Sequence, residues 1–276
     1  MHTGLKNNQD LKSLMFCFTC LTMYAYYWTY FSNHFIFMIL CLQTFQMSVI
    51  VHNSAHVHPF KDKVYNKIFL VFLTLLSGSP SSLYIPGHNE SHHKFLETET
   101  DMMRTTRMKY RSEFFNLILF VPTVLPDIIR NERRFMTEKL VKKSPLYFQY
   151  VLEFVIYHTF LFILFYMNWR KALIVYMIPT FVGKFMIISL NMLQHYKCDP
   201  HSKFNHSRNF TGPILNFLFL NNGYHTIHHN APGCHWSLLP KKHDEIKHHI
   251  DPNLIHNNIL LYVFKAHIAG NLPQIQ

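Results

Sequence analysis

Four long stretches of this 276-residue chain carry almost no charged side chain, and they constrain its fold more than any other feature. They cover residues 14–31, 34–51, 147–168 and 172–193. Each approaches the ~20 residues that a helix needs to cross a bilayer. Very short connections, at Ser32–Asn33 and Trp169–Lys171, join the stretches in pairs. We therefore predict an all-α membrane protein built from two transmembrane helical hairpins, with four spans.

Two further apolar stretches are interrupted by residues that break helices. Residues 66–86 contain Ser77–Pro80, and residues 114–129 contain Pro122 and Pro126. Proline removes a backbone donor and kinks a helix, so we predict re-entrant or interfacial segments here. Charged residues make up only 15% of the chain, against about 25% in soluble domains. With no linker or repeat in view, we predict a single membrane-embedded domain over residues 1–276.

The formal net charge of +11 is concentrated beside the apolar stretches. Lys and Arg cluster in residues 61–67, 104–111, 130–143 and 197–208. If both hairpins enter from one side, all four clusters lie on that side, and the positive-inside rule makes it cytoplasmic. This arrangement predicts a multi-pass protein of the bacterial inner membrane, or of the ER membrane in a eukaryote, with a cytoplasmic polar cap. It disfavours nucleic-acid binding, and it gives an acidic protein partner a basic face to dock on.

Histidines gather where the apolar stretches end. The chain has 21 of them, and nine fall into four groups. The groups are HNSAH with His52 and His56, HNESHH with His88, His92 and His93, NMLQH with His195, and HTIHH with His225, His228 and His229. On a helix, positions i and i+4 share a face, so His88 and His92 should chelate together while His93 points elsewhere.

Nine imidazoles exceed the needs of one metal ion. A zinc site takes about four ligands and often uses Cys, whereas imidazole suits iron, zinc and copper alike. The number therefore predicts a dinuclear centre with four or five nitrogens per metal. Ligating imidazoles need acceptors for their second N–H, and Asp101 and Asp199 are the best candidates. Asn191 lies four residues before His195 and so shares its helix face.

The four groups together resemble the histidine boxes of the membrane fatty acid desaturase superfamily, over about residues 30–240. The resemblance implies two non-haem iron ions held by the nine histidines, with O2 as co-substrate and Asn191 binding a metal-bound water. It also implies a fatty acyl substrate and a separate ferredoxin-like or haem electron carrier on the cytoplasmic face. The di-iron centre itself would be catalytic, and we assign no separate acid or base.

Other reactions on the same scaffold stay open. The second box is H-x-x-x-H-H, longer than the H-x-x-H-H of many acyl desaturases and similar to that of alkane hydroxylases. Desaturation of an acyl lipid or carrier-bound chain is our main hypothesis, and a hydroxylase, ketolase or terminal-alkene-forming oxidase is the alternative. A zinc-dependent membrane hydrolase is disfavoured because H-E-x-x-H is absent. A metal transporter is disfavoured because the histidines follow the spans rather than occupy their middles.

Overall fold

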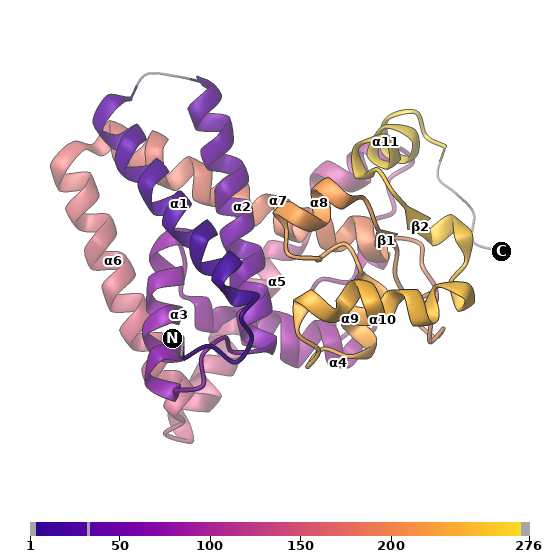
Figure 1. Ribbon diagram of the computed structural model, residues 1–276, viewed down its shortest axis with the longest axis horizontal. Helices are drawn as coiled ribbons and strands as arrows, with labels where there is room; N and C mark the ends of the chain where they lie inside the picture. The colour runs from indigo at the N-terminus through magenta and orange to yellow at the C-terminus, as the bar shows by residue number, and fades with distance from the viewer. Residues whose placement is uncertain (1–3, 32–33, 272–276) are drawn as a thin grey trace. The chain divides into compact units, whose positions relative to one another are not determined.

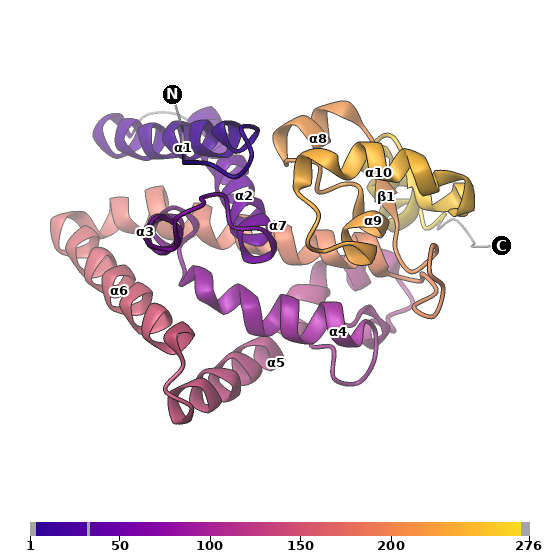
Figure 2. The ribbon, with the colours of Figure 1, turned by 60° about the horizontal axis from the view of Figure 1, so that its bottom comes forward.

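The computed structural model describes residues 4–31 and 34–271, which are mostly helical. They divide into two compact units. The first consists of the described residues up to Pro86 and of Glu132–Ile187, and the second consists of Gly87–Asn131 and the described residues from Ile188 onward. Figures 1 and 2 show the helices of each unit. The predicted all-α class is confirmed at this level.

The first unit holds the longest apolar helices. Its complete elements are α1 Asp10–Tyr30, α2 His34–His56, α3 Lys63–Ser77, the 3-10 turn η1 Ser81–Leu83, α6 Pro145–Lys171 and the π-helical η4 Ala172–Met177. Three elements are shared between the two units, namely the π-helical η2 Ile85–His92, α5 Glu113–Val141 and α7 Ile178–His195. Helices α1 and α2 pack against each other, as do α6 and η4. The predicted Ser32–Asn33 connection lies outside the described residues.

Two helical runs among the described residues are long and apolar enough to cross a membrane. They are His34–His56 and Pro145–His195, and a third is added if the bent pair Lys63–Ser77 and Ser81–Phe95 counts as one span. The second run has 51 residues, and its helix breaks at Asn168, whose φ of −164° and ψ of 101° are not helical. The break falls next to the predicted Trp169–Lys171 turn. The four-span arrangement itself stays a prediction.

Two segments differ from their predictions. Helix α1 forms, but it is not among the described helices that are long and apolar enough to cross a membrane, because its tyrosines and threonines make much of it polar. Helix α5 is also much longer than the predicted 114–129 segment, because it runs through Pro122 and Pro126 as far as Val141. Both prolines lie on the exposed side of the helix. Each proline removes a backbone hydrogen bond only on the exposed side of the helix, so the helix continues.

Helix α3 ends inside the apolar first unit, and its last carbonyls are satisfied by side chains from other helices. Tyr24 of α1 donates to the carbonyl of Leu76, and Tyr176 of η4 donates to that of Leu75. Lys184 of α7 donates to the carbonyl of Gly78, where the φ of +76° ends the helix. A helix end leaves its last carbonyls without partners, and each would be costly in an apolar surrounding. These contacts explain why the 66–86 stretch turns rather than continuing as one helix.

The second unit combines short helical turns with a small sheet. Besides the shared parts of η2, α5 and α7, its elements are α4 His93–Phe95, η3 Thr105–Arg107, β1 Asn209–Phe210, α8 Pro213–Leu218, α9 His225–Asn230, η5 Trp236–Leu238, α10 Leu239–Ile246, η6 Lys247–His249, η7 Pro252–Leu254, β2 Ile255–His256, α11 Ile259–Val263 and the π-helical η8 Phe264–Ile268. Strands β1 and β2 are parallel, and Asn209 is opposite Ile255. A buried cluster of Met108, Phe120 and Met192, among others, packs α5 against the end of α7. This packing fixes the end of α7, which carries His195.

Candidate metal centre

The second box lies on a π-helical turn, and this changes which of its histidines point together. Residues Ile85–His92 form the π-helix, and His93 begins α4. A π-helix bonds residue i to i+5, so its turn is wider than that of an α-helix. Accordingly Nε2 of His88 lies 3.0 Å from Nε2 of His93, while Nε2 of His92 points to His195, 3.2 Å away. The predicted pairing of His88 with His92 is therefore wrong, and the pair at i and i+5 replaces it.

Four histidines of the second unit converge through their Nε2 atoms, and we call them the His92 set. They are His92, His195, His225 and His229. Nε2 of His195 lies 2.8 Å from that of His225 and 3.2 Å from that of His229. The Nε2 atoms of His225 and His229 are 3.1 Å apart. His92, His195 and His225 are buried and His229 is half-buried, so most of the set is shielded from water.

The tautomers of two rings in the His92 set leave their facing nitrogens without protons. Nδ1 of His92 donates to Oδ2 of Asp101 at 3.0 Å, and Nδ1 of His195 donates to the carbonyl of His206 at 3.0 Å. Both partners only accept, and a neutral imidazole carries one N–H. In their neutral forms the two rings therefore present Nε2 lone pairs to each other, an arrangement that a cation between them would stabilise. The donor set fits a metal ion.

The electrostatics of His229 also favour a metal over a proton. Burial first, and then the neighbouring His93 and His225, hold the pKa of His229 well below its ordinary value. Burial lowers the pKa of an imidazole because it disfavours the charged form. The ring is therefore neutral near pH 7, which is the form that coordinates a metal.

Asp101 is a buried carboxylate fixed on three sides. Besides accepting from His92, it accepts the backbone N–H groups of Glu97 and Met103. Burial acts to raise the pKa of Asp101, but His92 and these donors outweigh it and hold the pKa below its ordinary value. Asp101 therefore stays ionised and holds the His92 ring with Nε2 toward the other members of its set.

The HTIHH group is positioned by a turn that only glycine fits. A Cβ atom on Gly223 would lie 2.0 Å from the carbonyl oxygen of Phe210. Gly223 accepts the N–H of Phe210 at 2.8 Å, which ties the turn to β1. Three residues later, Thr226 donates its N–H to Oδ1 of Asn209 at 3.1 Å, and its hydroxyl accepts from Nδ2 of the same side chain. Helix α9 therefore begins at a fixed place, with His225 and His229 on one face and His228 on another.

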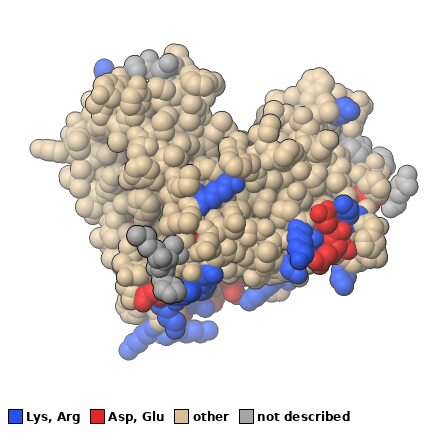
Figure 3. All heavy atoms as spheres, in the orientation of Figure 1, with Lys and Arg blue, Asp and Glu red and all other residues tan. Residues whose placement is uncertain are grey.

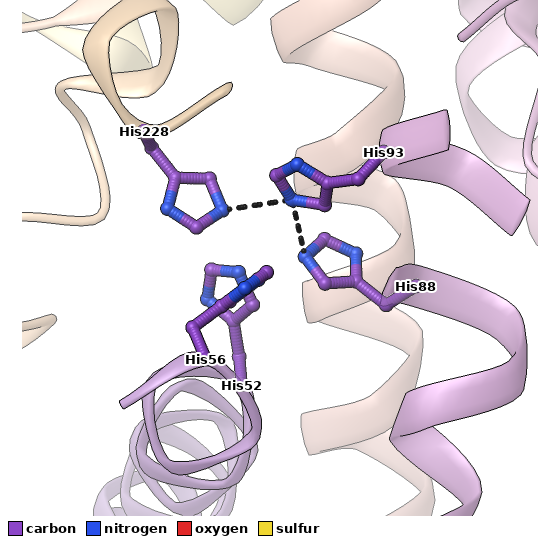
Figure 4. Close-up of side chains that lie close together, drawn as sticks. All are labelled: His52, His56, His88, His93 and His228. Atoms are coloured by element: carbon purple, nitrogen blue, oxygen red, sulfur yellow. Dashed lines mark hydrogen bonds between the residues drawn. The ribbon is translucent and has the colours of Figure 1, made fainter. Parts of the chain in front are cut away.

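Three more histidines of the second unit form what we call the His93 set. They are His88, His93 and His228, and Figure 4 shows them pointing toward one another. Nε2 of His93 lies 3.1 Å from that of His228, in addition to its contact with His88. Neighbouring histidines thus divide between sets, because His92 and His93 belong to different ones, as do His228 and His229. Adjacent rings serving two sites is the pattern expected from the sequence.

His52 and His56 lie in the first unit, on the last turns of α2. Their ring centroids are 5.1 Å apart and nearly perpendicular, so both rings leave the same face of the helix, as the i and i+4 spacing predicts. His52 is buried and packs beside Tyr84, with ring centroids 5.7 Å apart. The first box is therefore preformed as a pair of imidazoles within its own unit.

The other predicted residues have different surroundings. The Asn191 side chain donates to the carbonyl of Met103 at 3.2 Å. Asp199 does not contact a box histidine in the described part of the chain; its carboxylate instead accepts the N–H of His201, within its own turn. It lies in a proline-containing loop in which local turn bonds compete for the carboxylate. The carbonyl of His206 takes the role expected of Asp199, and no side-chain signal could have identified a backbone atom.

Substitution of Asp101 with asparagine should weaken the His92 set without removing it. The amide can still accept from His92, but it loses the negative charge that orients and polarises the ring. Loss of such a partner typically costs about 10–100-fold in metal affinity or activity. Metal retained after dialysis against a graded chelator would measure the loss. Glu99→Gln removes an exposed carboxylate from the same loop and should leave retention unchanged; equal retention in both variants would contradict the assignment.

Comparison with known proteins agrees with this geometry. A family model described as "Fatty acid desaturase" matches residues 23–257. The chain is similar to mouse sphingolipid delta(4)-desaturase DES1, at 25% identity over 70% of this chain and 59% of that protein. It is 24% identical to sphingolipid delta(4)-desaturase DES1-like of Arabidopsis thaliana, over 75% of this chain and 58% of that protein. The bovine DES1 is 25% identical over 84% of this chain and 74% of its own length.

The matches cover only part of the relatives. The chain spans less than two thirds of the length of the mouse and Arabidopsis proteins. The matched region nevertheless includes all four histidine groups, since residues 23–257 contain His52 through His229.

Proposed function

Because this chain belongs to the fatty acid desaturase family, we propose that it is an O2-dependent membrane oxidoreductase that desaturates a long acyl or sphingoid chain. The observation that carries the proposal is the buried convergence of four imidazole Nε2 atoms in the His92 set, with two rings fixed by Asp101 and the His206 carbonyl. Such a set needs a cation, and the family supplies iron as the expected one.

The residues that would hold two iron ions divide as follows. The His92 set would hold one ion. The His93 set, completed by His52 and His56 of α2, would hold the other. Support for adding the first box comes from its shared-face geometry on α2 and from the resemblance of the four groups to desaturase boxes. When bound, iron supplies the oxygen-dependent oxidation of an unactivated C–H bond, which side chains alone do not achieve.

The overall reaction balances with an external reductant. Two adjacent CH2 groups, O2, two electrons and two protons give one CH=CH group and two waters. We propose that a separate ferredoxin-like or haem carrier delivers the electrons on the cytoplasmic face. The chain's own residues orient the rings through Asp101 and His206, exclude water by burial, and keep His229 unprotonated. The names of the relatives make a sphingolipid chain the first substrate to test.

Hydroxylation is the second candidate, favoured by the H-x-x-x-H-H form of the second box. In that reaction one C–H, O2, two electrons and two protons give one C–OH and one water. The hydroxylated product is therefore heavier than the desaturated product by the mass of one water molecule. Mass spectrometry of cellular lipids distinguishes the two outcomes directly.

The test has two readouts on the purified full-length chain and on cells that express it. Metal analysis should find two irons per chain, and lipid profiling should find an additional double bond in an acyl or sphingoid chain relative to cells with the empty vector. One zinc per chain would overturn the oxidoreductase in favour of a hydrolase. Two irons with a hydroxylated product would move the assignment to the second candidate.

A further inference from the structure

The second unit carries an apolar surface that the proposed chemistry does not use. It is formed by large hydrophobic side chains of α8 and of the run from α11 to η8, all strongly exposed. We call this the α8–α11 face; its members are Ile214, Phe217, Leu260, Leu261, Phe264 and Ile268. Leu260 is 78% exposed and Ile214 is 75% exposed. Contiguous apolar patches of this kind mark interaction or membrane surfaces.

The two parts of the face lie together because they follow paired strands. Helix α8 begins after β1 and α11 begins after β2, and these strands are parallel. The pairing continues past the strands, since Thr211 donates its N–H to the carbonyl of His256 at 2.8 Å. A Cβ atom on Gly212 would lie only 2.2 Å from the carbonyl oxygen of Asn257. The two helices therefore both begin near the same end of the sheet.

The surface around these helices carries little charge. Figure 3 shows the atoms over α8 and α11 nearly free of charge, whereas charged atoms of the same unit gather over α10. Lys265 is an exposed cation among the apolar residues of η8. A basic side chain at the edge of an apolar helical face is typical of helices that lie in the bilayer interface.

The face is connected, through the first turn of α5, to the residues that follow a candidate membrane span. The run Pro145–His195 ends at His195, and the next two residues bind the start of α5. Tyr196 accepts from Asn116 at 2.9 Å, and Lys197 forms an ion pair with Glu113 at 2.6 Å.

The same first turn of α5 then reaches η8. Buried His267 of η8 donates from Nδ1 to the carbonyl of Glu113 at 3.1 Å. Two further aromatic residues of this turn, Phe114 and Phe115, are exposed. A chain of direct contacts thus runs from the end of the span, through α5, to the α8–α11 face. These contacts hold the α8–α11 face at a fixed place relative to the residues that directly follow the run Pro145–His195.

We propose that the α8–α11 face, with Phe114 and Phe115 beside it, lies in the lipid interface and anchors the second unit to the bilayer independently of the spans. The occupant is the acyl–headgroup boundary of the membrane itself. Removing apolar side chains from water is favourable in proportion to the area buried, so several large side chains suffice to hold the unit in one orientation. This anchoring does not depend on the metal or on the reaction.

Tryptophan quenching by brominated lipid tests this anchoring. Phe264→Trp and Ile214→Trp each place one indole on the face, and Lys247→Trp places one on exposed η6 as the matched control. Each full-length variant is reconstituted into vesicles of brominated phosphatidylcholine and compared with the wild type, whose three tryptophans give the background. An unchanged circular dichroism spectrum verifies the fold.

The added fluorescence at positions 264 and 214 should be quenched severalfold more strongly than that at position 247. Equal quenching at all three positions would overturn the proposal. Crosslinking between two chains through Leu260→Cys, with no quenching at positions 264 and 214, would also overturn it and assign the face to a second copy. Having two variants on different helices ensures that local misfolding of one does not decide the result.

Discussion

Replacement of His195 with alanine is expected to abolish activity and to remove iron from the protein. Nε2 of His195 contacts those of His92, His225 and His229 at 2.8–3.2 Å, so it is the common neighbour of the whole His92 set. The methyl side chain of alanine has no atom that can bind a metal, so the variant would keep only three of the four imidazole ligands of this set. Relative to the proposed two irons per chain, we expect the iron content to fall to one or none, and turnover to fall below detection.

The structural cost of this substitution has to be separated from the loss of a ligand. His195 is almost fully buried, and truncating a buried side chain to alanine costs about 2–5 kcal/mol. His195→Gln keeps most of the volume and a polar group, so it should retain the fold while still losing iron. His248→Ala changes an exposed histidine of the same unit and serves as the control. Full iron content in the glutamine variant, with unchanged turnover, would contradict the assignment.

The grouping of the site could be predicted from the sequence because ligands must be specific side chains. Four groups of histidines beside the ends of apolar stretches are a strong signal of a metal centre, and adjacent pairs such as His92 and His93 predicted two sites. The pairing inside the second box could not be predicted, since it depends on a π-helical turn rather than an α-helical one. Periodicity distinguishes a helix from a strand but not these two helical turns from each other.

The partners of the rings were only partly accessible to sequence reasoning. The carboxylate of Asp101 is a side-chain group, and its place nine residues after His92 made it a candidate acceptor for an imidazole N–H. The carbonyl of His206 is a backbone atom, available at every position, so nothing in the sequence distinguishes it. Similarly, Pro122 and Pro126 predicted a short segment because proline usually ends a helix, whereas the exposed position of both rings allows α5 to continue.

Arg208 is a second position where substitution should have a large effect, although no sequence pattern distinguishes it from the other arginines. Its side chain is fully buried, and no ion pair of it with a carboxylate is found in the described part of the chain. Nη1 donates to the carbonyl of Leu193 at 2.7 Å and more weakly to that of Tyr196. The guanidinium carbon also lies 4.7 Å from the centre of the Tyr262 ring. Arg208 therefore caps the end of α7 on both sides of His195.

Substitution of Arg208 with methionine is expected to lower the free energy of unfolding and to loosen iron binding. Removing the guanidinium takes the side-chain donor from the carbonyl of Leu193 and, among the described residues, leaves that of Tyr196 with only the weak thiol donor of Cys198, and a buried carbonyl without a partner costs about 1–3 kcal/mol. Relief from burying a charge works in the opposite direction. The helix-end carbonyls and the Tyr262 ring already stabilise that charge, so we expect the loss to dominate, at about 2 kcal/mol or more.

The lysine variant distinguishes the capping role from simple filling of space. Arg208→Lys keeps the positive charge but has no planar fork, so it should bind one carbonyl and give an intermediate stability. Thermal unfolding in detergent measures the order of stability, and the rate of iron release to a chelator measures the effect on His195. Arg111→Met removes an exposed arginine of the same unit and should change neither. If the methionine variant were as stable as the wild type and released iron at the same rate, the guanidinium would not hold the end of α7. If both stability and iron retention decreased in the order arginine, lysine, methionine, the bonds of Arg208 to the Leu193 and Tyr196 carbonyls would be connected to the position of His195 between them.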